Sequence, residues 1–135
     1  EDDIFYYPDL LVTCDPADDA KFYKTLPVVI VEVLSPSTER VDRLEKFLSY
    51  QRLPILEDYV LVDQEQMQVT VFRRASDWKP ERLGAGAVLR LPAVDFEQSV
   101  AAIYEDVRRV GVARKQAGRL FYVAQASRLC ISALR

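Results

Sequence analysis

The apolar residues of this chain are grouped in short runs that predict strands near its beginning. The run Phe5 to Cys14 is rich in aromatic and branched residues and ends at Asp15-Pro16, while Val28 to Leu34 is apolar at every position except Glu32. Branched and aromatic residues favour strands, and a run that is apolar on both faces is typical of a central strand covered on both sides. The polar segment from Asp15 to Pro27 predicts a surface loop between the two strands.

A helix is predicted next, over Glu39 to Arg52. Ser35-Pro36-Ser37-Thr38 supplies a turn and N-cap candidates before it, and Pro54 lies just beyond its end. The residues expected to form its apolar stripe are Val41, Leu44 and Leu48. The residues that recur every four positions, and are therefore expected to share a different, polar face, are Asp42, Lys46 and Tyr50.

The later part of the chain predicts further strands and a closing helix. Tyr59 to Asp63 and Gln68 to Arg73 are separated by a short turn and predict a hairpin, with a loop at Trp78 to Pro80. Ala87 to Leu91 predicts a weaker strand, and Val100 to Val110 predicts a helix. The fold class expected from this order is α/β, with a mixed central sheet flanked by helices and with the strands that carry Asp9 and Glu32 at the heart of that sheet. We expect one domain over residues 1–110 and a basic C-terminal tail over residues 111–135.

The composition limits the chemistry that this chain can perform. With 135 residues and 50% hydrophobic content it can build one packed core. Histidine is absent, which excludes a Ser-His-Asp triad, a Cys-His pair and histidine-ligated zinc within this chain. Residues 1–106 hold all 21 acidic residues against 11 basic ones, an excess of 10 negative charges. An acidic body argues against simple electrostatic coating of DNA and is compatible with a carboxylate metal site.

The sequence also suggests where the protein resides. Its longest apolar run is far shorter than the roughly 20 residues that a membrane span needs, so no membrane association is expected. Cys14 and Cys130 lack the spacing of a zinc site or a redox pair, which favours the cytoplasm. Because the chain begins at Glu1 without methionine and soon reaches a strand-like segment, we expect that an N-terminal part of the natural protein precedes it.

Two acids and a lysine are the residues best suited to catalysis. Asp9 follows Pro8 in the first predicted strand, Glu32 interrupts the apolar second strand, and Lys46 lies on the following helix. Carboxylates are hard-oxygen ligands suited to magnesium, which can neutralise the charge that develops on a phosphodiester and lower the pKa of an attacking water. A lysine ammonium nearby could orient the nucleophile and stabilise the transition state.

Each of these residues also has a purely structural explanation. Glu32 could cap the following helix or pair with an arginine. Asp9 is typical of a turn or an edge strand after proline, and Lys46 could pair with Asp42 one helical turn away. No single residue decides between structure and catalysis.

The most specific motifs of the chain lie in three stretches. They are YPDLLVTCD at 7–15, VVIVEVLSPSTERVDRLEKFLSYQ at 28–51 and EDYVLVDQEQMQVTVFRR at 57–74. Together they resemble the Uma (type two) family of restriction-endonuclease-like proteins, within the PD-(D/E)XK nuclease superfamily. The resemblance covers about Asp3 to Val107 and implies a metal-dependent endonuclease that hydrolyses nucleic-acid phosphodiester bonds.

The resemblance also implies roles for individual residues. Asp9 and Glu32 correspond to the metal-binding acids, with the backbone carbonyl of Val33 as a further ligand and magnesium or manganese as the cofactor. The third position of the (D/E)XK triplet is Leu34 rather than lysine, and the helix residue Lys46 is expected to substitute for the missing lysine. The implied partner is nucleic acid, with DNA favoured. A homodimer is compatible, since cutting both strands of a duplex needs two sites.

Two other functions remain open from the sequence. The chain could be an inactive binding or assembly module with a nuclease fold, which would be favoured if arginines neutralised the carboxylates. It could also hydrolyse a phosphoester that is not a nucleic acid. The side chains that could contact phosphate or a base, but that more often are solvated, ion-paired or packed in a core, are Arg40, Arg43, Tyr50, Arg73, Arg74 and Trp78.

Overall fold

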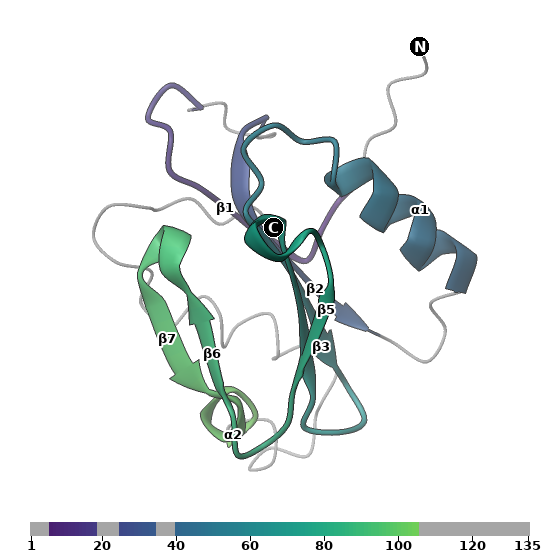
Figure 1. Ribbon diagram of the computed structural model, residues 1–135, viewed down its shortest axis with the longest axis vertical. Helices are drawn as coiled ribbons and strands as arrows, with labels where there is room; N and C mark the ends of the chain where they lie inside the picture. Colours follow the sequence, from purple (N-terminus) through teal and green to yellow (C-terminus); the bar gives the residue numbers. More distant parts are fainter. Residues whose placement is uncertain (1–5, 19–24, 35–39, 106–135) are drawn as a thin grey trace.

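The computed structural model describes residues 6–18, 25–34 and 40–105, and a mixed β-sheet of five strands is its main element (Figure 1). The strands follow the chain in the order β1-β2-β3-β4-β5. They are β1 (Leu10–Thr13), β2 (Pro27–Leu34), β3 (Asp58–Asp63), β4 (Val69–Arg73) and β5 (Pro80–Leu83). β2 and β3 are parallel, and the other neighbouring pairs are antiparallel. The α/β class and the mixed sheet predicted from the sequence are confirmed.

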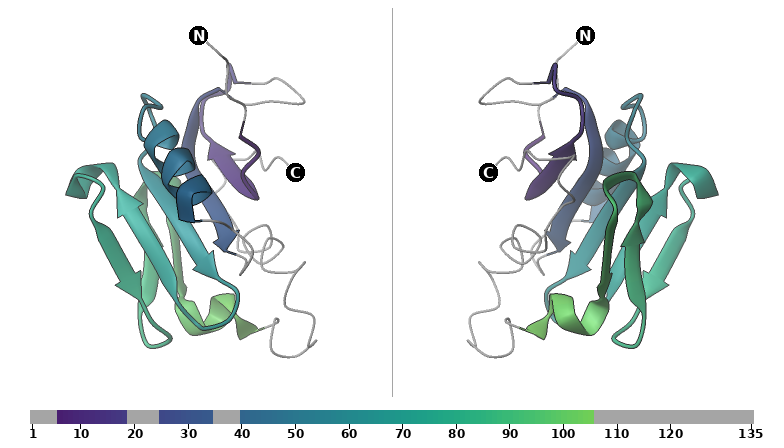
Figure 2. Two further views of the ribbon diagram at one scale, coloured as in Figure 1. Left: turned by 90° about the vertical axis from the view of Figure 1, so that its right-hand side faces the viewer. Right: turned by 90° about the vertical axis from the view of Figure 1, so that its left-hand side faces the viewer.

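Two further layers cover the sheet. The helix α1 (Arg40–Tyr50) lies on one face, and the two-stranded sheet of β6 (Val88–Leu91) and β7 (Phe96–Ser99), followed by the short helix α2 (Val100–Ile103), lies on the other (Figures 1 and 2). Short 3-10 turns at Arg74–Ser76 and Pro92–Val94 follow β4 and β6. Among the residues that the structure describes, no helix is long and apolar enough to span a membrane.

The strand β2 explains why both layers are needed. Successive side chains of a strand point to opposite faces, and β2 accordingly contributes to two separate cores. Val29 and Val31 are buried in the larger core, against β6, β7 and α2, while Ile30 is buried in the smaller core on the α1 side. Full burial of one such side chain stabilises the fold by roughly 1.5–3 kcal/mol. Glu32 has the same parity as Ile30 and therefore faces α1.

Several elements differ from the sequence prediction. β5 and β7 were not predicted, and Pro80, assigned to a loop, begins β5. Of the helix predicted over Val100 to Val110, the structure describes α2 (Val100–Ile103), and the residues from 106 onward, including the basic tail, lie outside the described residues. The hairpin of β3 and β4 is confirmed.

The orientation of α1 corrects one prediction. Leu44 and Leu48, expected in its buried apolar stripe, are 56% and 49% exposed. The helix instead packs Phe47 and Tyr50 into the smaller core. The physical reason is that aromatic rings fill the space over the sheet, while the buried carboxylate of Glu32 requires polar partners from the same helix face. The side chain of the third predicted stripe residue, Val41, lies outside the described residues.

A second correction concerns the first strand. We expected the strands that carry Asp9 and Glu32 at the heart of the sheet. They are neighbours, as predicted, but β1 is the first strand in the sheet order, and among the described strands it pairs only with β2. Asp9 itself lies in a bend just before β1.

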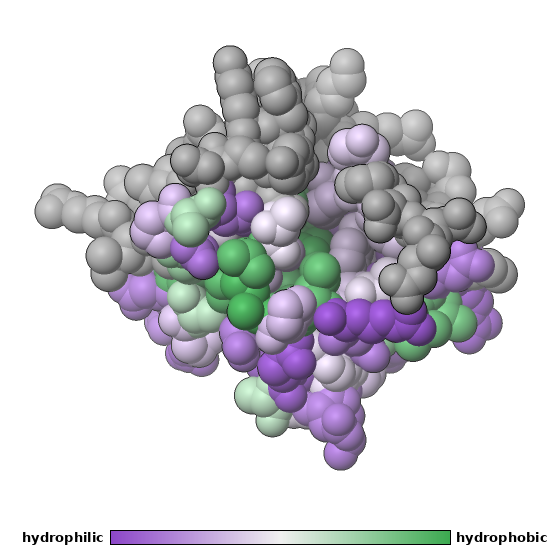
Figure 3. Space-filling model, turned by 90° about the horizontal axis from the view of Figure 1, so that it is seen from above, coloured by the Kyte–Doolittle hydropathy of each residue, from purple (hydrophilic) through white to green (hydrophobic). Residues whose placement is uncertain are grey.

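Seen from above, apolar side chains form the middle of the described surface and hydrophilic ones border it (Figure 3).

Candidate active site

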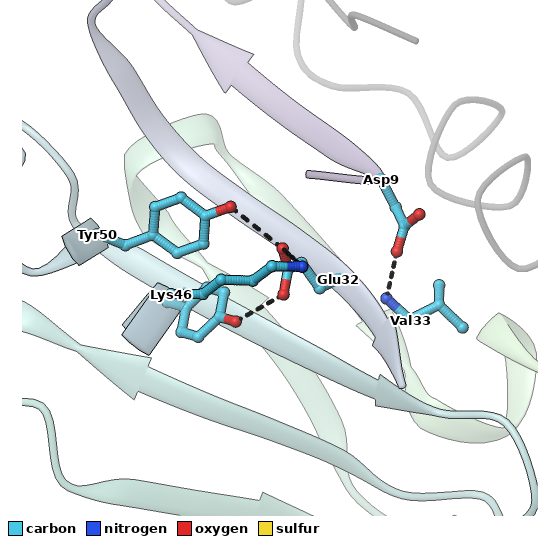
Figure 4. A network of polar contacts seen from close by, with 6 residues as sticks. Asp9, Glu32, Val33, Lys46 and Tyr50 are labelled. Carbon is cyan, nitrogen blue, oxygen red and sulfur yellow. Dashed lines mark hydrogen bonds and ion pairs between the residues drawn. The ribbon is translucent and has the colours of Figure 1, made fainter. Parts of the chain in front are cut away.

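Glu32 is the centre of a polar cluster between β2 and α1. The residue is only 7% exposed. Its Oε1 accepts a hydrogen bond of 3.1 Å from the Tyr50 hydroxyl, and its Oε2 accepts one of 2.8 Å from the Tyr59 hydroxyl (Figure 4). The Lys46 ammonium lies 3.8 Å from Oε1. These two hydrogen bonds and the ion pair compensate for the loss of water around a buried carboxylate, which would otherwise be costly.

The two tyrosines are permanent donors to this carboxylate. Burial raises the pKa of Tyr50 and Tyr59 far above the ordinary value of 10.0, and the negative charge of Glu32 raises it further. Both hydroxyls therefore stay protonated at any physiological pH, so each can donate its proton to Glu32. Since Tyr50 comes from α1 and Tyr59 from β3, the pair fixes the carboxylate from two directions.

Lys46 points toward Glu32, as its proposed role requires. Its side chain is 24% exposed, so the ammonium lies between the protein interior and solvent. Leu34, at the position where the resemblance would place a lysine, lies two residues beyond Glu32 and so faces the same side of β2. Lys46 reaches that side from α1, which is compatible with the expected substitution. The side chain of Asp42, the alternative partner of Lys46, lies outside the described residues.

Asp9 lies at the edge of the same pair of strands. Its Oδ2 accepts a hydrogen bond of 2.8 Å from the backbone N–H of Val33 (Figure 4). The next residue, Leu10, is opposite Val31, which directly precedes Glu32 in β2. The negative charge of Asp9 is also one of the smaller contributions that raise the pKa of Tyr50, after burial and Glu32. The exposed Asp9 carboxylate and the buried Glu32 carboxylate thus belong to one small region, at the first residues of β1 and the end of β2.

The backbone of Val33 is directed toward Asp9. Its N–H donates to the Asp9 carboxylate, and in a strand a residue's N–H and C=O face the same side. The Val33 carbonyl therefore faces Asp9, as its N–H does. An oxygen ligand in this position is compatible with a cation held between the two strands.

The chemistry of the ligands that the resemblance implies suits a magnesium or manganese ion better than a softer metal. Those ligands are two carboxylates and a backbone carbonyl, all hard oxygen donors. Within residues 6–18, 25–34 and 40–105, no group of three or more histidine, cysteine, aspartate or glutamate side chains is placed to hold a metal. This small donor set suits magnesium, which retains several waters and is often bound by one or two carboxylates plus substrate phosphates.

The other side chains considered for nucleic-acid contact have mostly structural roles. Arg73 donates to Asp58 at 2.9 Å and to Glu81 at 3.2 Å. Arg74 donates to the backbone carbonyls of Leu56 and Leu53 at 2.7 and 2.6 Å, and its guanidinium lies over the Trp78 ring. Trp78 packs against the smaller core.

Three further side chains complete the comparison with the sequence. Arg40 is exposed, and Arg43 is half-buried. Tyr59 was not predicted as a site residue. The sequence places Tyr59 in a predicted strand, but its contact with Glu32 depends on the parallel pairing of β2 with β3.

A comparison with family models identifies one family. Residues 1–102 match the family model Uma2, which is described as "Putative restriction endonuclease". The chain is 38% identical over 100 residues to the uncharacterized protein slr1290 of Synechocystis sp., covering 72% of this chain and 53% of that protein. It is 32% identical over 80 residues to the uncharacterized protein sll1609 of the same organism, covering 57% of this chain and 45% of that protein.

A solved structure shares the fold. The crystal structure of a "putative nuclease belonging to DUF820" from Anabaena variabilis is similar with a TM-score of 0.51 and 19% sequence identity. The likeness covers 61% of this chain and 46% of that chain. The chain therefore spans about half the length of the relatives that it matches.

Proposed function

The chain belongs to the Uma2 family, described as "Putative restriction endonuclease", and from this premise we propose that it is a magnesium- or manganese-dependent endonuclease that hydrolyses phosphodiester bonds of DNA. The observation that carries the proposal is the Glu32 cluster. A glutamate residue that is only 7% exposed, beside a lysine and close to a second acid, costs more free energy to bury than a purely structural role requires.

Three groups of this chain would hold the metal: the carboxylates of Asp9 and Glu32 and the backbone carbonyl of Val33. When bound, the metal supplies positive charge that stabilises the transition state at phosphorus and makes a water molecule more acidic. The protein's own contribution begins with orientation. Hydrogen bonds from Tyr50 and Tyr59 restrict the Glu32 carboxylate to one position, which removes reorganisation from the reaction.

We propose that Lys46 acts on the attacking water and on the phosphate of the substrate. Its ammonium, 3.8 Å from Glu32 Oε1, provides three N–H donors at the border between the interior and solvent. There it can orient an attacking water and stabilise negative charge on a non-bridging phosphate oxygen. The small core of aromatic residues beneath it limits the access of bulk water on that side of α1, which strengthens these electrostatic interactions.

The test is cleavage of mixed DNA and RNA substrates with magnesium or manganese. Wild-type protein is compared with the variants Asp9→Ala, Glu32→Ala and Lys46→Ala, each shown to be folded. We expect metal-dependent cleavage of DNA by the wild type and its loss in all three variants. Cleavage that survives Glu32→Ala would contradict the assigned site. A wild-type chain that binds DNA without cutting it would favour a binding module.

A further inference from the structure

An enclosed guanidinium nitrogen without a partner lies on α1. The Nε of Arg43 is buried and has no hydrogen-bond partner among the described residues. A buried donor left unsatisfied costs about 1–3 kcal/mol, and more when it belongs to a charged group. Native proteins keep few such groups, and a bound ion or a functional role is a common reason for those that remain.

The position of Arg43 places it beside the Glu32 cluster. Arg43, Lys46, Phe47 and Tyr50 are spaced by three and four residues, so they lie on one face of α1. Phe47 and Tyr50 show that this face packs on the sheet. The positive charge of Arg43 also acts on the hydroxyl of Tyr59, whose pKa it lowers slightly against the larger opposite effects of burial and Glu32. The guanidinium and the Lys46 ammonium are therefore neighbours on the face that carries the site.

The other arginines near the smaller core are already engaged. Arg73 is ion-paired with two acids, and Arg74 donates to two backbone carbonyls. Arg43 differs because neither an acid nor a carbonyl of the described residues accepts from it. Arg43 as a whole residue is half-buried, so part of its side chain is open to a ligand arriving from solvent.

We propose that Arg43 binds a non-bridging phosphate oxygen of the nucleic-acid substrate, next to the phosphate that Lys46 approaches. This inference rests on the proposed nuclease function. The planar guanidinium offers parallel N–H donors that match a phosphate in a bidentate arrangement, which a lysine cannot reproduce. Partial burial strengthens such a contact because less water competes for it. Lys46 thus acts at the reacting phosphate, and Arg43 binds the neighbouring phosphate of the nucleic-acid backbone.

The experiment compares Arg43→Ala and Arg43→Lys with Arg52→Ala. Arg52 is an exposed arginine just beyond the end of α1, so it is a matched control for loss of one positive charge. Cleavage of a DNA duplex is measured with magnesium, and binding of a fluorescent duplex is measured with calcium in place of magnesium over a series of salt concentrations. We expect Arg43→Ala to lower the cleavage rate about 10- to 100-fold. The slope of log affinity against log salt should fall by about one, as for the loss of one phosphate contact.

The controls separate this contact from a structural role. Arg43→Lys should restore the salt slope but not the full cleavage rate, and Arg52→Ala should stay within about twofold of the wild type in cleavage. If Arg43→Ala does not fold, Arg43→Gln keeps the aliphatic stem and is measured in its place. A folded variant without the guanidinium that cleaves within twofold of the wild type, with an unchanged salt slope, overturns the inference and leaves the nuclease proposal intact. If the wild type does not cleave at all, the nuclease proposal fails, and an unchanged salt slope in Arg43→Ala then overturns this inference as well.

Discussion

The hydrogen bond between Tyr59 and Glu32 should stabilise the fold through the charge of the carboxylate. Tyr59→Phe removes a hydroxyl that donates to Glu32 Oε2 at 2.8 Å. A hydrogen bond to a charged group contributes about 1.5–3 kcal/mol, and the freed oxygen is poorly hydrated because the Glu32 side chain is only 9% exposed. We therefore expect Tyr59→Phe to lower the free energy of unfolding by about 2 kcal/mol.

A double-mutant cycle isolates the part due to the charge. In a Glu32→Gln background the same hydroxyl donates to a neutral amide, so Tyr59→Phe should cost only about 1 kcal/mol. The coupling between the two positions should then be about 1 kcal/mol. Urea unfolding followed by fluorescence of Trp78, the single tryptophan of the chain, measures each free energy.

Tyr104 provides the matched control for this cycle. Its hydroxyl is also buried but donates to two neutral acceptors, the backbone carbonyls of Asp63 and Gln68, at 2.6 and 2.9 Å. Tyr104→Phe should cost the same in the wild-type and Glu32→Gln backgrounds. Equal costs of Tyr59→Phe in the two backgrounds would refute the reasoning, because the carboxylate charge would then contribute nothing to holding the tyrosine.

Two further predictions follow from the same region. The pKa of Tyr50 and Tyr59 is raised in the folded chain, so the unfolded chain loses these protons first as the pH rises. The stability that they contribute is therefore fully present below about pH 10 and falls above it. Urea unfolding midpoints at pH 9, 10 and 11 check this, and a midpoint that rises with pH would contradict it. Phe47 packs against the rings of Tyr59, Phe72 and Trp78, whereas Leu44 is exposed. Phe47→Ala should therefore lower the free energy of unfolding by about 3 kcal/mol, and Leu44→Ser by less than about 0.5 kcal/mol. The reverse order in urea unfolding would mean that the helix faces the other way.

Much of the central sheet could be predicted from residue patterns. β2 is apolar on both faces because both are covered, and Glu32 interrupts it because the α1 side carries a polar cluster. The bounds of β3 and β4 follow from their branched and aromatic residues and the polar turn between them. These elements are predictable because the physical cause of their structure, burial of alternating side chains, is local in the sequence.

The elements that were missed depend on contacts between distant residues. β5 and β7 have the sequences PERL and FEQS, whose side chains are mostly exposed, and their strand structure comes from backbone pairing with β4 and β6. The buried face of α1 could not be chosen by periodicity, because both Leu44 and Phe47 belong to acceptable apolar spacings. The packing of α1 on the sheet determines which of the two residues is buried.

Some residues of the candidate site could also be predicted from the sequence, and others could not. Asp9, Glu32 and Lys46 could be proposed from residue type and resemblance, and the structure places the lysine beside the buried glutamate. Tyr59 could not be assigned a partner, because its contact with Glu32 depends on the parallel register of β2 and β3. Arg43 could not be separated from the other arginines, because only the structure shows which of them have partners.

Electron paramagnetic resonance of manganese bound to the full chain is the decisive measurement for a metal at this site. We expect a bound ion in the wild type and a large loss of affinity in both Asp9→Asn and Glu32→Gln, which remove one carboxylate charge each with little change of shape. Glu65→Gln, at an exposed position in the turn between β3 and β4, is the control and should bind as the wild type does. Manganese affinity that is unchanged in either site variant would contradict a metal held between Asp9 and Glu32.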